Sequence, residues 1–502
     1  MNITTLLEMA ADAFPDRTAI VSGPARLTYS ELLSASRAAG AVIANTDARY
    51  LALLDLNSIA VPIALFGAAF AGIPYVPLNY RLTDDELDTL VERVTPSLLV
   101  GGGDALRRVR VADGTRATTR EAFLDALSGE APAPADVMDD SNLMAVQLFT
   151  SGTTGTPKAA ILRHENLMSY ILGTVEFASA DEDEANLVSV PPYHIAAVAA
   201  ILSSVYSGRR MVTLEAFDPK GWLDICQSER ITTGFIVPTM LTRIMDEIAD
   251  DPERWDLSSL RSIRYGGGKM PVPVIGRAME LLPRVEFTNA YGMTETSSTI
   301  CLLDPDDHRA ALSSDDPAVR RRLGSVGRPI GTVEIGIRDD AGLALPANIV
   351  GHIYARGDQV SGEYLDQGSL CDADGWFSTR DRGYLDDAGY LFLDGRTDDV
   401  IVRGGENISP GEIEDTLLAH PAVADVAVVA VPDEEWGEAI GAAVVIRLNQ
   451  AVSVAELQSW VRDRLRSSRV PSMIEFRDEL PYNELGKILR RVIRDELKAR
   501  SA

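Results

Sequence analysis

The chain has 502 residues, of which 46% are hydrophobic and 24% charged, so its composition excludes a disordered, collagen-like or coiled-coil protein. This length exceeds what one hydrophobic core usually serves, and we expect at least two domains. The formal net charge of −27 argues against nucleic acid as a partner, because such binding needs basic residues to neutralise phosphates.

Signals for targeting and redox chemistry are sparse. Cys226, Cys301 and Cys371 stand alone in the sequence, so neither a disulfide framework nor a cysteine zinc site is indicated. Residues 1–16 lack the basic and apolar regions of a signal peptide. Ile59–Leu78 carries no charge, but its prolines and glycines favour a buried helix and strand over a membrane span. We therefore expect a cytoplasmic protein with no integral membrane segment.

Helical and extended patterns alternate along the chain, which is typical of a layered α/β architecture with buried sheets. Hydrophobic periodicity is the basis of the assignment. In chain order it predicts a helix over Thr28–Ile43, strands over Tyr50–Leu56 and Leu98–Val100, a loop or linker over Ser128–Asn142, strands over Leu143–Phe149, Val333–Arg338 and Ile353–Ala355, a helix over Ile413–Leu418, strands over Val426–Val431 and Ala442–Leu448, and a helix over Val454–Leu465.

The pattern of predicted helices and strands changes twice in the second half of the chain. Between about residues 323 and 396, short strands are separated by Gly/Asp turns, as expected of a small β-rich unit. After Arg396 the pattern is again mixed helix and strand. We predict a domain boundary near Thr397, with an N-terminal domain over residues 1–396 and a C-terminal domain over residues 397–502.

A loop rich in glycine and hydroxyl residues follows the predicted strand that ends at Phe149. Backbone N–H groups, hydroxyls and one ammonium in such a loop can surround phosphate oxygens. It is not a Walker A loop, because a proline precedes the lysine and alanines follow it. The alternative is an ordinary surface loop. The candidate phosphate-binding residues are Thr150, Ser151, Gly152, Thr153, Thr154, Gly155 and Lys158.

A second segment combines a flat aromatic side chain, a glycine and a hydroxyl–carboxylate pair. The pair, Thr294 and Glu295, suits Mg²⁺, which prefers one or two carboxylates together with substrate phosphates. A structural turn capped by the same two residues is the alternative. The remaining residues of the segment are Asn289, Ala290, Tyr291, Gly292 and Met293.

Two further segments carry single charged residues in turn-like surroundings. Asp381 can accept both hydroxyls of a ribose, a recurrent device in nucleotide binding, although a run of ordinary β-turns would look similar. Lys487 follows a glycine near the C-terminus, where a lone lysine is usually solvated surface.

Together these segments resemble the adenylate-forming superfamily of acyl-CoA synthetases, peptide-synthetase adenylation domains and luciferases. The resemblance extends from the N-terminal region to Lys487, and the motifs are ordered and spaced as in the family. It implies an α/β fold: a large N-terminal domain of two α/β subdomains plus a β-rich subdomain, and a small mobile α+β C-terminal domain. It also implies ATP-dependent formation of an acyl-adenylate, followed by attack of a thiol, usually that of coenzyme A.

The resemblance assigns roles to individual residues. Lys158 and its loop would hold the β,γ-phosphates, and Glu295 would hold Mg²⁺. Lys487 would bridge the carboxylate and the α-phosphate. Asp381 would bind the ribose with Arg396 nearby, and Gly267 and Gly268 would frame the adenine together with Asn289–Met293.

The resemblance also implies sites for the acid and for coenzyme A. The C-terminal domain would turn about a hinge at Asp398, and coenzyme A would meet Arg403, Gly404, Gly405 and Trp436, although Trp436 could be simple packing. His194 would lie near the acyl carboxylate; a satisfied core histidine is the alternative. The expected acyl pocket consists of His194, Ile195, Val198, Phe235, Tyr265, Gly266, Met270 and Ser298.

The sequence departs from the family pattern at three positions. Arg380 replaces the glycine before the ribose aspartate and adds a charge to which we assign no role. Asp398 replaces the hinge lysine, a known alternative among CoA ligases, and Ala159 replaces the glycine after the loop lysine. None of these changes removes an expected catalytic charge.

The substrate and the thiol acceptor stay open. The predicted pocket is mostly apolar and has no aspartate for an ammonium group, which disfavours α-amino acids and leaves aromatic, fatty and alicyclic acids. The acceptor is coenzyme A or the phosphopantetheine of an acyl carrier protein acting in trans. A nucleotide-binding protein that has lost catalysis is the alternative from another class. A homodimer is left open.

Overall fold

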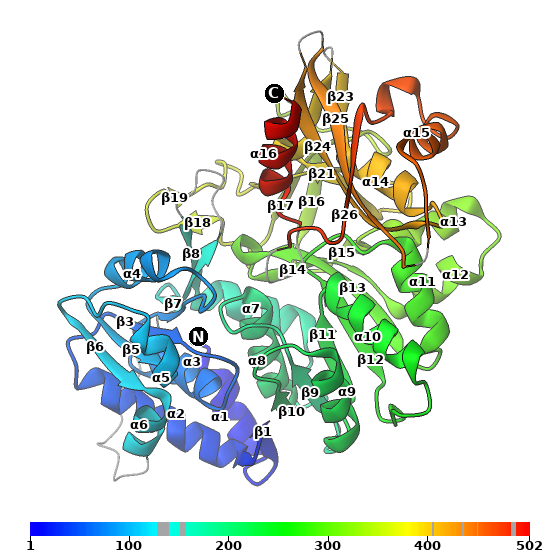
Figure 1. Cartoon of the computed structure of the whole chain (residues 1–502). Coiled ribbons are helices and arrows are strands. Elements are labelled where there is room, and N and C mark those ends of the chain that lie inside the picture. The colour runs from blue at the N-terminus through cyan, green and yellow to red at the C-terminus, as the bar shows by residue number, and fades with distance from the viewer. Residues whose placement is uncertain are drawn as a thin grey trace.

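The computed structural model describes residues 1–127, 140–150, 157–403, 406–433, 436–448, 450–482 and 488–501 (Figure 1). The predicted loop over Ser128–Asn142 lies largely outside this range. In Figure 1 the orange and red C-terminal elements form a separate unit above the blue-to-green body.

The first sheet lies in the central part of the large N-terminal portion of the molecule. Parallel pairing joins β1, β10, β9, β11, β12 and β13, whereas β2, β14 and β15 are antiparallel additions at the two edges. Its order is β15 (Arg328–Pro329), β14 (Ser298–Leu303), β13 (Glu286–Met293), β12 (Ser262–Gly266), β11 (Thr233–Ile236), β9 (Ala185–Val188), β10 (Arg210–Thr213), β1 (Thr18–Ser22) and β2 (Ala25–Thr28).

Helices cover both faces of this sheet, as buried parallel strands require. On one face, Trp222, Leu241 and Ile275 of α9 (Pro219–Ser228), α10 (Pro238–Asp250) and α11 (Val272–Leu281) share a core with Ile263 and Phe287. On the other face, α1 (Thr4–Ala13), α7 (His164–Thr174) and α8 (Ile195–Ser207) contribute to a second core that includes residues of β9 and β10.

The second sheet lies on the left of Figure 1, among the blue and cyan elements. Helices α2 (Tyr29–Ala44), α3 (Ala60–Phe70), α4 (Asp84–Arg93), α5 (Gly103–Arg107) and α6 (Arg120–Ala126) accompany it. Its order is β19 (Gly368–Ser369), β18 (Glu363–Tyr364), β8 (Lys158–Arg163), β7 (Met144–Thr150), β4 (Tyr75–Pro77), β3 (Tyr50–Leu54), β5 (Ser97–Gly101) and β6 (Thr115–Thr119).

The charge-free stretch Ile59–Leu78 forms the buried helix α3 followed by strand β4, as predicted. Two glycines let α2 and α3 approach closely: a Cβ on Gly40 would lie 2.7 Å from Cβ of Phe70, and one on Gly67 would lie 2.6 Å from Cβ of Ala39. Among the helices of the described residues, none combines the length and apolar character needed to cross a membrane.

The third sheet is the β-rich unit expected before residue 396. Its order is β16 (Glu334–Arg338), β17 (Gly351–Arg356), β20 (Phe377–Leu385) and β21 (Leu391–Arg396), all antiparallel. Helices α12 (Pro305–Ser313) and α13 (Pro317–Arg321) precede it. Strand β20 bulges between Ser378 and Arg382, which pair with Tyr354 and His352 of β17. β-Bulges are common next to functional sites, where they change the direction in which a side chain points.

The C-terminal part forms its own sheet and core. Strands β23 (Glu406–Ile408), β22 (Ile401–Arg403), β25 (Gly437–Ile446) and β24 (Val423–Asp433) pair antiparallel, and β26 (Met473–Arg477) joins β25 in parallel. Helices α14 (Pro410–Leu418), α15 (Val454–Arg462) and α16 (Arg490–Ser501) accompany the sheet. The predicted α/β fold, with a large N-terminal domain and a small C-terminal domain, is confirmed.

The predicted helices and strands correspond to observed elements whose ends differ by a few residues. The helix predicted from Thr28 is α2, which begins after a capping box made by Thr28 and Glu31. The predicted strand Val426–Val431 extends to Val423–Asp433 because it forms a long hairpin with β25.

Candidate active site

The adenine-side motif lies where two parallel strands end side by side. Strands β12 and β13 pair with Gly266 opposite Ala290, and a Cβ on Gly266 would lie only 2.2 Å from the Ala290 carbonyl oxygen. Gly267 follows with φ +77°, a left-handed conformation that favours glycine. Gly267, Gly268 and Asn289–Met293 all line one cavity of about 610 Å³. The carboxyl edge of a parallel sheet is the usual place for a ligand.

Asp381 is a buried carboxylate that contacts residues of two different sheets, Tyr291 in β13 and Arg396 in β21. Its Oδ2 accepts a hydrogen bond of 2.7 Å from the Tyr291 hydroxyl, and its Oδ1 lies 3.2 Å from Nε of Arg396. Burial and the adjacent carboxylate raise the pKa of Tyr291 above its usual value, so this phenol stays a donor. The structure thus brings Tyr291, Asp381 and Arg396 together on the cavity wall.

Arg380 occupies the bulge next to this carboxylate. Its φ is +62°, which is uncommon for a residue with a side chain, and its side chain is exposed. Burial and Glu295 raise the pKa of the Tyr364 hydroxyl, and the positive charges of Arg380 and Arg396 offset a smaller part of that rise. The Arg380 guanidinium therefore lies on the side of the site that contains Tyr364.

Glu295 and Lys158 meet at Tyr364, a residue that sequence reasoning missed. Glu295 lies in a short 3-10 turn (Thr294–Thr296) directly after β13 and is 9% exposed. The Tyr364 hydroxyl donates to its Oε1 over 2.5 Å, and the Lys158 ammonium lies 5.2 Å from the centre of the Tyr364 ring. Burial, followed by the Glu295 charge, raises the pKa of Tyr364. Nothing in the local sequence around Glu363–Tyr364 marks this tyrosine as functional.

The loop predicted to bind phosphates is flanked by two paired strands, β7 and β8. Thr150 at the end of β7 is the register partner of Lys158 at the start of β8. The predicted phosphate ligands Ser151, Gly152, Thr153, Thr154 and Gly155 lie outside the described residues.

The donors near Glu295 fit a magnesium ion bound with a nucleotide. The described parts of the chain contain no group of three or more His, Cys, Asp and Glu residues placed to hold a metal ion. Glu295 offers one carboxylate oxygen beyond the one that accepts from Tyr364. A single carboxylate combined with substrate phosphates is the coordination that Mg²⁺ commonly adopts.

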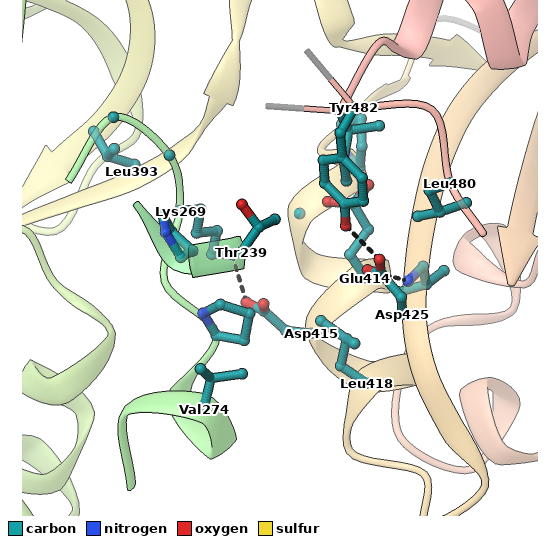
Figure 2. Close-up of a pocket in the computed structure, with 18 of the residues that line it drawn as sticks. Thr239, Lys269, Val274, Leu393, Glu414, Asp415, Leu418, Asp425, Leu480 and Tyr482 are labelled. Atoms are coloured by element: carbon teal, nitrogen blue, oxygen red, sulfur yellow. Dashed lines mark hydrogen bonds and ion pairs between the residues drawn. The ribbon is translucent and has the colours of Figure 1, made fainter. Parts of the chain in front are cut away.

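The C-terminal domain closes the other side of the cavity (Figure 2). Lys269 projects from the body and its Nζ lies 2.7 Å from Oδ2 of Asp415 on α14. Glu414, also on α14, is buried and accepts a hydrogen bond of 2.9 Å from Nη2 of Arg490. The facing wall of the C-terminal domain also includes Asp425, Leu480 and Tyr482.

The sequence assigned roles to Lys487 and Asp398 in the C-terminal part of the chain, and the structure describes only Asp398. Lys487 lies outside the described residues, but Tyr482 and Ile488, on either side of its segment, both line the cavity. Asp398 belongs to a short 3-10 turn (Thr397–Asp399) between β21 and β22. The neighbouring Asp399 lies 3.6 Å from Nε of Arg490.

His194 immediately precedes α8. Its Nε2 is inaccessible to solvent and has no hydrogen-bond partner among the described residues, unlike a satisfied core histidine. Its ring lies 4.4 Å from that of Tyr193. Burial, followed by the charge of Arg81, lowers the pKa of His194 to about 3. The imidazole is therefore neutral at physiological pH.

The structure separates the predicted acyl-pocket residues. Tyr265 is fully buried on the α10–α11 face of β12, where its hydroxyl lies 2.7 Å from Nε2 of His308, and Met270 belongs to the same core. Gly266 follows Tyr265 in the strand and therefore faces the other way. Val198 is buried in the α8 core, whereas His194, Ile195, Phe235 and Ser298 are partly exposed. Tyr265 and Met270 thus contribute to the core and do not line a pocket with Gly266.

Of the predicted coenzyme A residues, the structure describes Arg403 and Trp436. Trp436 is 46% exposed, and the Arg403 guanidinium lies 5.8 Å from the centre of its ring. Nη1 of Arg403 donates to the Ser468 carbonyl over 2.9 Å. Gly404 and Gly405 are outside the described residues.

Comparison with known proteins agrees with this geometry. Residues 7–365 match the AMP-binding enzyme family and residues 412–487 match the AMP-binding enzyme C-terminal domain. The chain therefore belongs to the AMP-binding enzyme family, and within it to the AMP-forming acid–CoA ligases, which work through an acyl-adenylate.

Named relatives cover almost the whole chain. A feruloyl-CoA synthase of Amycolatopsis sp is 34% identical over 496 residues, which is 96% of each protein. A 2-succinylbenzoate–CoA ligase of Bacillus licheniformis is 31% identical over 496 residues, 96% of this chain and 98% of that protein. The o-succinylbenzoate CoA synthetase of Bacillus subtilis, solved with its acyl-adenylate intermediate, superposes with a TM-score of 0.82 at 27% identity over 98% of each chain.

Proposed function

We propose that the protein converts a small to medium organic acid into its coenzyme A thioester in two steps at the cavity between its domains. In the first step a carboxylate oxygen attacks the α-phosphorus of ATP, the bond between the α- and β-phosphates breaks, and pyrophosphate leaves. In the second step the sulfur of coenzyme A attacks the acyl carbon, AMP leaves, and the thiol proton is released. The observation that carries this proposal is the convergence of Asn289–Met293, Asp381 and Arg396 on a cavity that both domains line.

The nucleotide would be held at the carboxyl ends of β12 and β13. Gly267 and Gly268 leave room for a flat base, and Asp381 offers acceptor oxygens for the ribose hydroxyls. Tyr291 and Arg396 already contact Asp381, so they hold its carboxylate in place before the nucleotide arrives. Such preorganisation lowers the cost of binding.

The phosphates would lie toward Lys158 and Glu295. Lys158 supplies an ammonium opposite its register partner Thr150, and Glu295 with Thr294 would hold Mg²⁺. When bound, Mg²⁺ neutralises phosphate charge and favours departure of pyrophosphate. Tyr364 orients Glu295 by donating a hydrogen bond to Oε1. A neutral His194 would border the acyl carboxylate without adding a charge to it.

Lys487 would stabilise the charge that develops on the α-phosphate during the first step. The positions of Tyr482 and Ile488 support this role, because both residues line the nucleotide cavity and flank the segment that contains Lys487. Rotation about Asp398 would then withdraw Lys487 and present Arg403, Gly404, Gly405 and Trp436 to coenzyme A.

Carboxylate-dependent exchange of labelled pyrophosphate into ATP tests the first step. We expect exchange with at least one member of a broad panel of aromatic, fatty and alicyclic acids. No exchange with any acid would favour a nucleotide-binding protein that has lost catalysis. Supplying coenzyme A and, separately, an acyl carrier protein then identifies the acceptor, because only the true acceptor discharges the adenylate.

The Lys487→Ala variant separates the two steps. We expect it to lose nearly all adenylation and to keep thioester formation from supplied acyl-adenylate. Equal loss of both activities would contradict the role assigned to Lys487.

A further inference from the structure

The hairpin that carries Glu295 contains two strained residues. Strands β13 and β14 pair with Met293 opposite Ser298, so the chain reverses its direction within a few residues. Ser297 and Ser298 have φ +53° and +103°, values that residues with a side chain rarely adopt. Such outliers cost free energy, and they persist at functional sites where the surrounding structure holds them in place. The hairpin therefore depends on contacts that stabilise this conformation.

Gln359 supplies such contacts from a distant segment of the chain. It lies between β17 and β18 and is fully buried. Its Nε2 donates to the Thr296 carbonyl oxygen over 3.1 Å and to the Thr299 carbonyl oxygen over 2.8 Å. These two carbonyls stand immediately before and immediately after the strained pair. Oε1 of Gln359 accepts a hydrogen bond of 2.8 Å from the Thr332 hydroxyl, which fixes the orientation of the carboxamide.

The segment that contains Gln359 also contacts Glu295 directly. The backbone N–H of Gly362 donates to the Glu295 carbonyl oxygen over 3.0 Å, and the Tyr364 hydroxyl donates to Oε1 of its carboxylate. Backbone and side chain of Glu295 are thus both held from one segment. Because the side chain starts from the hairpin backbone, the conformation of the hairpin determines where the second carboxylate oxygen of Glu295 can reach.

Satisfying two buried carbonyls would by itself be a purely structural role. The position of the hairpin favours a role at the site. Gly292 and Met293 line the nucleotide cavity, and a Cβ on Gly292 would lie only 1.8 Å from the Ser298 carbonyl oxygen. The strained pair also follows Glu295 by two residues. Relaxation of the strain would therefore displace the cavity wall and Glu295 together.

Building on the proposed function, we propose that Gln359 is a positioning residue for the magnesium ion that binds with ATP. It holds the strained hairpin in the conformation that directs the second carboxylate oxygen of Glu295 toward the phosphates. Gln359 does not line the nucleotide cavity, so it acts through Glu295 and takes no part in the chemistry.

Removing the amide donors tests this inference. Gln359→Met keeps the length of the side chain and offers no N–H to the two carbonyls. We expect the Mg²⁺ concentration for half-maximal pyrophosphate release to rise by about tenfold, as for other residues that orient a metal ligand. Calorimetric titration should show weaker binding of ATP with Mg²⁺ and unchanged binding of ATP in EDTA. An unchanged Mg²⁺ dependence, or equal losses of affinity with and without Mg²⁺, would overturn the proposal.

A second background tests the strain directly. In the double variant Ser297→Gly with Ser298→Gly the hairpin keeps its conformation without strain, because glycine adopts a positive φ freely. Adding Gln359→Met to this background should raise the Mg²⁺ requirement by at most about threefold, since the effects of residues in one network are not additive. A rise of equal size in both backgrounds would show that Gln359 does not act through the strained pair, and it would overturn the proposal.

A control variant separates positioning from a general loss of stability. Ile20→Val shortens a buried side chain in β1, which lies toward the opposite end of the first sheet from β14. It should lower the melting temperature and leave the Mg²⁺ requirement unchanged. An equal shift in Ile20→Val and Gln359→Met would show that the Mg²⁺ requirement follows stability alone, which would overturn the proposal.

Two further measurements cover misfolding and inactivity. If Gln359→Met does not fold, Thr332→Val removes the hydroxyl that orients the carboxamide and should raise the Mg²⁺ requirement in the same direction. An unchanged requirement in Thr332→Val would then overturn the proposal. Absence of pyrophosphate release with every acid would refute the proposed function, whereas the titrations with ATP decide the role of Gln359 without turnover.

Discussion

The Tyr364 hydroxyl lies 2.5 Å from Oε1 of Glu295 and joins residues that are 69 positions apart in the chain. The same tyrosine ring lies beneath the Lys158 ammonium, at 5.2 Å from its centre. One phenol therefore contacts both charged groups expected at the phosphate end of the nucleotide. A hydrogen bond to a carboxylate is about twice as strong as one between neutral groups, so this contact sets the orientation of Glu295.

Replacing Tyr364 by phenylalanine should weaken metal-dependent activity. Residues that orient a metal ligand typically change metal affinity by about 10- to 100-fold. We expect the Mg²⁺ concentration for half-maximal pyrophosphate release to rise by such a factor in Tyr364→Phe. The control is Tyr384→Phe, which alters a tyrosine that stacks on Phe392 at 5.0 Å in the third sheet. An unchanged Mg²⁺ dependence in Tyr364→Phe would show that Tyr364 does not orient Glu295.

Replacing Arg380 by glycine should stabilise the protein. Arg380 has φ +62°, where glycine is free of strain, and a non-glycine residue in this region costs on the order of 1 kcal/mol. We expect the melting temperature of Arg380→Gly to rise by about one degree, because the unfolding entropy of a chain of this size is large. Arg382→Gly, in the same strand, should lower it, because Arg382 has no positive φ to relieve and glycine there adds only conformational freedom to the unfolded chain. A lower melting temperature in both variants would show that the Arg380 side chain contributes more than its backbone strain costs.

Separating Lys269 from Asp415 should affect the two reaction steps unequally. Their side chains are 42% and 56% exposed, so the pair contributes little to stability, at most about 1 kcal/mol. It does connect the body to α14 while the C-terminal domain borders the cavity. We expect Asp415→Asn to keep the wild-type melting temperature, to slow adenylation severalfold, and to spare thioester formation from supplied acyl-adenylate.

A charge exchange provides the matched control for this pair. The double variant Lys269→Asp with Asp415→Lys should recover most of the adenylation rate because the attraction is restored with its signs reversed. If the double variant is as slow as the single one, or if both steps slow equally in Asp415→Asn, the contact does not favour the adenylation arrangement.

His194 should make stability depend on pH on the acid side. Its pKa is about 3 in the folded protein and near 6.5 in an unfolded chain. Between these values the unfolded state binds more protons, so stability falls as pH drops from about 6.5 toward 3. In His194→Gln this contribution is absent. We expect the variant to lose less stability than the wild type between pH 6.5 and 4, measured by denaturant midpoints. Parallel pH curves for both proteins would contradict a neutral, buried His194.

Local patterns in the sequence predicted much of this protein. The helix at Thr28–Ile43 and the strand at Leu98–Val100 were predictable because hydrophobic periodicity and capping residues act over a few neighbours. The motifs around Lys158, Glu295 and Asp381 indicated an adenylate-forming ligase because each keeps its residues close together in the chain. The roles of individual residues stay predictions.

Only the tertiary structure decided which side chains meet. Strand alternation placed Tyr265 in the core and Gly266 on the opposite face, whereas the sequence alone had assigned both to one pocket. Tyr364 reaches Glu295 through strand register and long-range packing that no local pattern encodes. Composition and motif order therefore determine the class of chemistry, and the geometry between distant segments determines which polar and charged side chains meet.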